Sequence, residues 1–181
     1  MNVYISMLKG INVGGQKQLR MESLRESYEG LGFSRVRSYV QSGNIIFESP
    51  EIEPSVLRKR IEAKIEQAYR CQISVFIRQP HEFQSLLAGN PFINDRDVDP
   101  GKLHVTFLYH VPSEPWWSEM ASPRDSTDEF ARSEMAIYLF CPNGYAKTRL
   151  SNSFFERRLG MPVTTRNWNT VNALYKIATA I

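Results

Sequence analysis

The chain has 181 residues, enough for one substantial hydrophobic core or two small fused ones. Hydrophobic residues make up 42% and charged residues 23%, which is typical of a globular protein and excludes a disordered one. No apolar run approaches the ~20 residues that span a bilayer, and the first ten residues lack the features of a secretory signal, so we expect a cytoplasmic protein without a membrane segment. The net charge of +3 permits anionic partners, although nucleic-acid binders usually show a larger excess.

The first element is predicted to be a strand over residues 2–8, because apolar residues alternate there. The glycine-rich stretch KGINVGGQK, residues 9–17, follows directly. Apolar residues then recur at helical spacing from 21 to 31, and Gly32 stands where a helix commonly ends in a left-handed conformation. This part of the chain therefore predicts strand, loop and helix.

Two alternating runs, 36–41 and 44–49, are predicted to form a hairpin around Ser42-Gly43. A two-residue turn would pair Val40 with Ile45 and Ser38 with Phe47. A helix opening at Pro54, with an apolar stripe through residue 68, and a strand over residues 73–77 follow. The order βαββαβ is that of the ferredoxin-like fold.

The pattern then begins again. We expect further elements in this order: a helix at 81–87, a linker at 90–101, a strand at 103–110, a helix at 114–120, strands at 129–133 and 135–141, a helix at 151–159, a strand at 163–166 and a helix at 169–180. The third strand starts 28 positions before the fourth in both halves, 43 to 71 and 135 to 163. We therefore predict an α+β protein with two ferredoxin-like (βαββαβ) subdomains related by duplication, at 1–89 and 102–181, with residues 90–101 as the linker.

The predicted topology brings two loops of the first half together. The first strand runs antiparallel to the third and fourth, so the 9–17 loop and the 41–44 turn should emerge at the same end of the sheet. A glycine-rich turn that feeds a helix presents backbone N–H groups to phosphate or carboxylate. The candidate ligand-binding residues there are Lys9, Gly10, Asn12, Gly14, Gly15, Lys17, Gln41, Ser42 and Asn44.

This loop matches no standard nucleotide-binding motif. Gln16 occupies the lysine position of a P-loop, and Lys17 occupies the position of the Ser/Thr that binds magnesium. The G-x-G-x-x-G spacing of dinucleotide-binding folds is also absent. A purely conformational role, in which Gly14 and Gly15 supply positive φ angles at a turn, stays open.

The second half offers a second candidate set at one end of its sheet: Lys147, Asn152, Arg166 and Asn167, with Arg149 nearby. The guanidinium of Arg166 suits either an oxyanion or a buried carboxylate such as that of Glu156. Asn167 or Asn169 could instead cap the last helix.

One face of the first sheet suggests RNA as a possible partner. Tyr4, Tyr39 and Phe76 are expected on the face opposite the core, with Arg37 and Arg78 between them, as in sheets that stack bases. The alternative is that the second half covers this face.

Neither a metal site nor a cofactor is indicated. Cys71 and Cys141 form no disulfide framework, and His81, His104 and His110 lack zinc-ligand spacing. No catalytic residue can be assigned, so whether the protein is an enzyme stays open. The leading hypothesis is binding of an anionic ligand, such as a nucleotide, a phosphorylated metabolite or RNA. The rivals are an enzyme of phosphoryl-transfer type without evident metal ligands and a protein-interaction module that uses the Trp116-Trp117 pair.

Three stretches carry a family resemblance: LKGINVGG, LGFSRVRSYVQSGNIIF and FFERRLGMPVTTRNWNTV. With these motifs the chain resembles the bacterial domain-of-unknown-function 1697 family along nearly its whole length. The resemblance implies two intertwined ferredoxin-like subdomains and no established activity. Members usually carry arginine before the first glycine, where this chain has Lys9, and lysine cannot bind an oxyanion bidentately.

Overall fold

The computed structural model describes residues 1–12, 18–94, 96–114, 117–123 and 126–181. None of the helices in these ranges is long and apolar enough to cross a bilayer. By its internal contacts the chain divides into two compact units, one formed by residues 1–84 and 173–181 and the other by residues 85–172.

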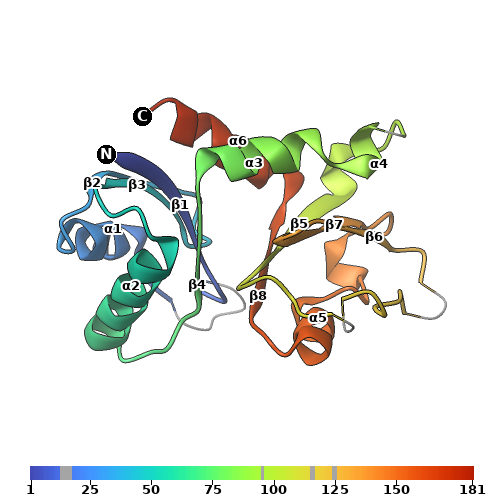
Figure 1. The fold of residues 1–181 in the computed structure, drawn as a ribbon, viewed down its shortest axis with the longest axis horizontal. Coiled ribbons are helices and arrows are strands. Elements are labelled where there is room, and N and C mark those ends of the chain that lie inside the picture. Colours follow the sequence, from blue (N-terminus) through green and yellow to red (C-terminus); the bar gives the residue numbers. More distant parts are fainter. Residues whose placement is uncertain (13–17, 95, 115–116, 124–125) are drawn as a thin grey trace. The chain divides into compact units, whose positions relative to one another are not determined.

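The first unit is a four-stranded antiparallel sheet with the strand order β2-β3-β1-β4 (Figure 1). Its elements follow the order βαββαβ, so the ferredoxin-like prediction is confirmed. They are β1 (Asn2–Leu8), α1 (Met21–Glu29), β2 (Ser34–Tyr39), β3 (Asn44–Ser49), α2 (Pro54–Tyr69) and β4 (Val75–Arg78), and α3 (Pro80–Ala88) follows them.

The predicted register of the β2–β3 hairpin is wrong by two residues. Ser38, not Val40, lies opposite Ile45, and Tyr39 lies opposite Asn44. The connection is therefore a four-residue loop, 40–43, in which Val40 has a φ of +50° and is 51% exposed. Because the shift is an even number of residues, the paired residues Ser38 and Ile45 still face the predicted side of the sheet, whereas Val40 lies outside it.

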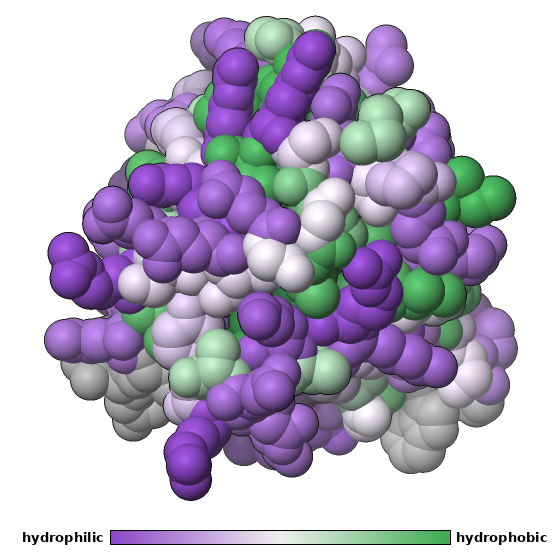
Figure 2. All heavy atoms as spheres, turned by 90° about the vertical axis from the view of Figure 1, so that its left-hand side faces the viewer, coloured by the Kyte–Doolittle hydropathy of each residue, from purple (hydrophilic) through white to green (hydrophobic). Residues whose placement is uncertain are grey.

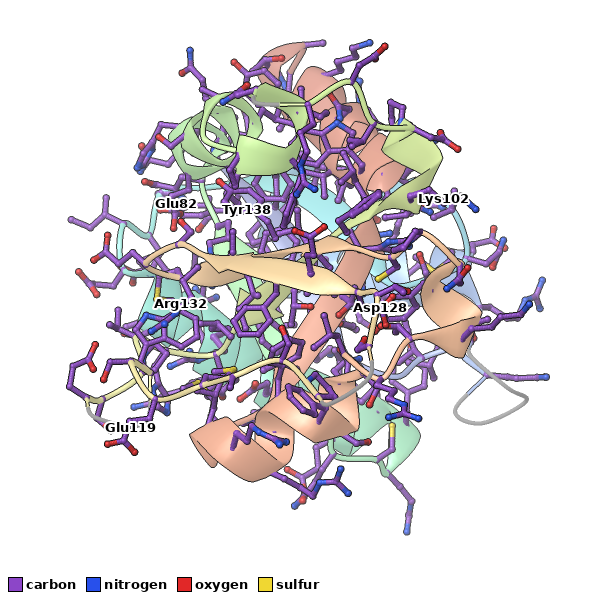
Figure 3. The ribbon with its side chains drawn as sticks, turned by 90° about the vertical axis from the view of Figure 1, so that its right-hand side faces the viewer. Glu82, Lys102, Glu119, Asp128, Arg132 and Tyr138 are labelled. Carbon is purple, nitrogen blue, oxygen red and sulfur yellow. The ribbon has the colours of Figure 1, made fainter. Side chains whose placement is uncertain are left out.

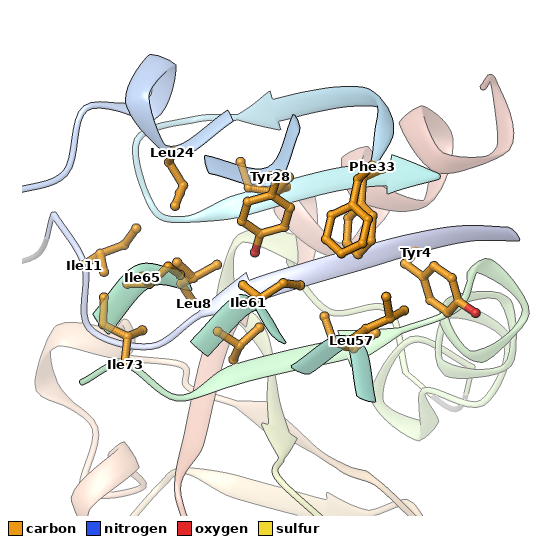
Figure 4. Packing of buried hydrophobic residues seen from close by; sticks show 14 of the residues in the cluster. Tyr4, Leu8, Ile11, Leu24, Tyr28, Phe33, Leu57, Ile61, Ile65 and Ile73 are labelled. Carbon is orange, nitrogen blue, oxygen red and sulfur yellow. The ribbon is translucent and has the colours of Figure 1, made fainter. Parts of the chain in front are cut away.

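The core of the first unit lies between the sheet and the helices α1 and α2 (Figure 4). Tyr4 belongs to this core and stacks on Phe47 with a centroid distance of 5.7 Å. The expectation that Tyr4 faces away from the core is therefore wrong. Both faces of β1 are buried, so alternation along the strand does not reveal which face the helices cover. On the face that Figure 2 shows, most side chains are hydrophilic, with apolar ones between them.

The second unit has a sheet with the equivalent order, β6-β7-β5-β8, again fully antiparallel. Its elements are α4 (Pro91–Asn94), the 3-10 turn η1 (Pro100–Lys102), β5 (Leu103–Leu108), β6 (Glu129–Arg132), β7 (Ala136–Phe140), the 3-10 turn η2 (Tyr145–Lys147), α5 (Asn152–Leu159), β8 (Val163–Asn167) and the start of α6 (Trp168–Thr179).

The described residues of the helix expected at 114–120, which are 114 and 117–120, are not helical. The described residues between β5 and β6 adopt turns and irregular structure. Met120 is nevertheless 7% exposed and belongs to the core under the sheet, and Trp117 packs against the same cluster. In the second unit, apolar residues of an irregular segment thus contribute to the core as helix α1 does in the first unit.

The pairing of β1 with β4 in the first sheet is repeated by the pairing of β5 with β8 in the second. Leu8 pairs with Val75 in the first sheet, as Leu108 pairs with Val163 in the second. Three positions along, Ile5 lies opposite Arg78, and Val105 lies opposite Arg166. The equal spacing of 28 residues between the third and fourth strands does not hold, because β3 and β4 begin at residues 44 and 75 whereas β7 and β8 begin at 136 and 163.

Strand β5 and most of strand β7 are buried on both faces of the second sheet, whereas the edge strand β6 is partly exposed. One face packs on α5 through Phe154 and Phe155. On the other face, Tyr138 points away from α5, and its hydroxyl donates to the Leu86 carbonyl of α3 at 3.0 Å (Figure 3).

Candidate functional site

Two loops of the first unit meet at the same end of its sheet, where the strands β1 and β2 end, as predicted. The Leu8 amide donates to the Gly43 carbonyl at 2.8 Å, which joins the end of β1 to the 40–43 turn. Gly43 has a φ of +72°, and a Cβ atom there would lie 2.5 Å from Cδ1 of Ile11. Only glycine allows this contact without a shift of its neighbours. We call residues 9–12, 18–20 and 40–43 the loop edge.

The side chain of Asn12 joins the two ends of the β1–α1 connection through hydrogen bonds to the backbone of Leu19. Its Nδ2 donates to the Leu19 carbonyl at 2.9 Å, and its Oδ1 accepts from the Leu19 amide at 2.8 Å. Asn12 has a φ of +55°, a conformation that asparagine tolerates better than most residues. Its carboxamide thereby fixes the backbone on both sides of the loop at the start of α1.

An open pocket of about 390 Å³ lies at the loop edge. The described residues that line it are Asn12, Gln18, Leu19, Arg20 and Gln41. The β1–α1 connection and the β2–β3 turn both contribute, so the pocket depends on the meeting of these two segments. Among these residues, all except Leu19 are polar.

Arg20 gives the pocket its positive charge. It occupies the N-cap position of α1, where it makes no side-chain capping hydrogen bond, so the positive end of the helix dipole lies beside it. The guanidinium lies 3.8 Å from the Glu22 carboxylate, and both side chains are largely exposed. A solvated pair of this kind contributes little energy and gives way readily to another anion.

The other predicted residues of the first half have different places. Asn44 is fully buried, and its amide donates to the Tyr39 carbonyl and the Ser42 hydroxyl at 3.2 and 2.9 Å. It therefore shapes the turn. Lys9 and Gly10 lie on the loop edge, where the Lys9 amide donates to Ser74. Gly14, Gly15 and Lys17 fall outside the described residues.

The sequence interpretation missed Gln18, Leu19 and Arg20 because it ended the glycine-rich loop at Lys17. A usable signal was present. The helical pattern begins at Met21, so the three residues before it flank a helix N-terminus, and one of them is a cation.

The second unit has a polar cluster at the end of its sheet from which the β7–α5 connection leaves. Thr165 donates its hydroxyl hydrogen to Asn152 Oδ1 at 2.7 Å, so Thr106 must donate to Thr165 across their 2.8 Å contact. Tyr145 stacks on His104 with a centroid distance of 4.7 Å. The chain order had predicted that the two segments carrying Tyr145 and Thr165 meet at this end.

The other predicted residues of this half serve different purposes. Asn167 caps α6, because its Oδ1 accepts from the Thr170 amide at 2.8 Å. Arg166 is buried and donates to the Thr164 hydroxyl and the Thr165 carbonyl at 2.8 and 2.9 Å. Burial lowers the pKa of its guanidinium to about 10. Lys147 is exposed in η2.

The sheet face considered for RNA stacking is covered at β4, although Arg37 on β2 is exposed. Phe76 and Arg78 are 1% and 5% exposed, and Arg78 forms an ion pair with Glu82 at 3.6 Å. Since Tyr4 lies in the opposite core, the three aromatic rings do not form one platform.

We expect His104 to make the stability of the protein depend on pH. It is 9% exposed, its Nδ1 makes no hydrogen bond of ordinary geometry with any described residue, and burial lowers its pKa. The unfolded state takes up a proton near pH ~6.5, which the folded state resists. We therefore expect the free energy of unfolding to fall as the pH drops below that value, because the unfolded state then binds more protons.

Urea unfolding between pH 7.5 and 5.5 measures this effect. His104→Phe keeps a ring against Tyr145 and should flatten the pH dependence, whereas His110→Gln, at an exposed position, should leave it unchanged. An identical slope in wild type and His104→Phe would show that this imidazole is not responsible.

Both cysteines are free thiols, and burial raises the pKa of Cys141. Within the described ranges, no group of three or more His, Cys, Asp or Glu side chains gathers where it could hold a metal ion.

Comparisons with known proteins agree with this architecture. A conserved bacterial protein, SP0830 from Streptococcus pneumoniae, has a similar structure with a TM-score of 0.74 and 22% sequence identity, over 98% of each chain. This likeness shows the fold. No curated protein matches the chain. Residues 1–138 match the family described as "Protein of unknown function (DUF1697)". Since this match covers most of the chain, the protein belongs to the DUF1697 family.

Proposed function

We propose that the protein binds an anionic ligand in the pocket at the loop edge of the first unit. The observation that carries this proposal is the joint lining of the pocket by Arg20, at the N-terminus of α1, and by Gln18 and Gln41. The guanidinium can donate two parallel hydrogen bonds to a carboxylate or phosphate, and the carboxamides add neutral donors.

An incoming anion would replace the Glu22 carboxylate as the partner of Arg20. The exchange costs little, because the 3.8 Å pair is exposed to solvent. The helix dipole of α1 would favour the same anion. The site thus offers a guanidinium, a helix N-terminus and carboxamide donors within one pocket.

Two free thiols agree with a reducing compartment, so we place this activity in the cytoplasm. The family and the similar streptococcal structure support a bacterial setting.

Isothermal titration at low salt, with inorganic phosphate and phosphorylated small molecules as probes, tests the proposal. Arg20→Gln should weaken binding about 2- to 5-fold, since an ion pair at a solvated site contributes up to about 1 kcal/mol. Arg157→Gln is the matched control, because it removes the same charge from an exposed position on α5. Equal losses in both variants would indicate nonspecific attraction, and no binding of any probe to the wild type would refute the proposal.

A further inference from the structure

The pocket is larger than a simple anion requires. Its volume is about 390 Å³, within the range of roughly 300–1,000 Å³ that small-molecule sites occupy. A water molecule takes up about 30 Å³ of liquid, so the space corresponds to on the order of ten waters. A phosphate or carboxylate held by Arg20 would leave most of it unfilled.

The remaining lining favours a neutral group that both donates and accepts hydrogen bonds. Gln18 precedes α1 and Gln41 lies in the β2–β3 turn, so the two carboxamides reach the pocket from separate segments. Each offers a carbonyl acceptor beside an NH₂ donor. This donor–acceptor pair matches the edge of a nucleobase, which glutamine can contact with two hydrogen bonds.

The backbone that carries these side chains is fixed. The two hydrogen bonds between Asn12 and Leu19 hold the residue next to Gln18. The bond from the Leu8 amide to the Gly43 carbonyl holds the turn that contains Gln41. Binding therefore orders the glutamine side chains on a frame that already exists, which lowers its entropic cost.

Among the described residues that line the pocket, Arg20 supplies the charge. Its guanidinium can hold one phosphate group with two parallel hydrogen bonds.

We infer that the ligand is a nucleoside monophosphate, with its phosphate on Arg20 and the α1 N-terminus and its base against Gln18 and Gln41. The inference rests on the proposed function. Asn12 is a positioning residue in this arrangement, because its amide is engaged with Leu19.

Titration of the full chain at low salt tests the inference. The probes are the 5′-monophosphates of the four common nucleosides, ribose 5-phosphate and the unphosphorylated nucleosides. At least one monophosphate should bind 10-fold or more tightly than ribose 5-phosphate. Gln41→Ala should remove most of this advantage and weaken ribose 5-phosphate binding far less, whereas Arg20→Gln should weaken both.

Gln67→Ala, at an exposed position of α2, is the matched control and should change neither affinity. If ribose 5-phosphate binds as tightly as every nucleotide, the inference fails while the proposed anion site stands. If a nucleotide shows the advantage but Gln41→Ala keeps it, the placement of the base is wrong. If no probe binds, both proposals fail.

Discussion

Gly43→Ala is expected to destabilise the first unit by roughly 2–5 kcal/mol. A left-handed conformation costs a residue with a side chain about 1–2 kcal/mol, and Gly43 has a φ of +72°. The new Cβ would also lie 2.5 Å and 2.7 Å from two carbons of the buried Ile11, and 3.0 Å from Cβ of Leu8. Overpacking of this kind costs a further ~1–3 kcal/mol.

Gly10→Ala separates the two contributions, because Gly10 has a φ of +66° but no described atom beyond its chain neighbours lies within 4 Å of the place that a Cβ would take. It should cost only the conformational part, about 1–2 kcal/mol. When Ile11→Ala is also present, Gly43→Ala should cost little more free energy of unfolding than Gly10→Ala does, because the atoms of Ile11 that its Cβ would meet are gone. Urea unfolding of the wild type, Gly43→Ala, Ile11→Ala and the double variant measures this difference as a coupling energy. An equal cost at Gly10 and Gly43 would mean that the two loops do not approach as closely as described.

The meeting of these loops was predictable from chain order alone. Once the order βαββαβ is recognised, an antiparallel β1 forces the 9–17 loop and the 41–44 turn to the same end of the sheet. The details of the site were not predictable in this way. Asn44 looked like an exposed hydrogen-bond donor, but the turn is two residues longer than expected and uses its amide internally.

Two other errors have a common physical cause. The face of Tyr4 was interpreted from the alternation of apolar residues, and the helix at 114–120 from the repeated order of elements; neither pattern reports what covers a residue. Strand β1 is buried on both faces, so either face could have met the helices. Residues 117–120 supply apolar side chains to a core without being helical, and Pro112 precedes them by a few positions. Only the tertiary contacts distinguish these cases.

Phe47→Ala should cost about 3–5 kcal/mol, as truncations of buried aromatic residues usually do. Phe47 is fully buried on β3 at the centre of an aromatic cluster. Its ring lies 4.5 Å from that of Phe33, 5.4 Å from that of Tyr28 and 5.7 Å from that of Tyr4, measured between centroids. The cavity would open on the side of the sheet that faces Tyr28 of α1.

Phe47→Leu distinguishes lost volume from lost ring contacts. Leucine fills much of the space but forms no aromatic pair, and such pairs contribute about 0.5–1.5 kcal/mol each beyond buried area, so we expect an intermediate cost of about 1–3 kcal/mol. Val56→Ala, on the outer side of α2, should change stability by no more than about 0.5 kcal/mol. The polar contact between Ser6 Oγ and the Tyr28 hydroxyl, 2.7 Å long, limits how far Tyr28 can move into the cavity. Since the Tyr28 ring is held in this way, the alanine variant should be less stable than the leucine variant. Equal unfolding midpoints would show that the cluster collapses around the smaller side chain.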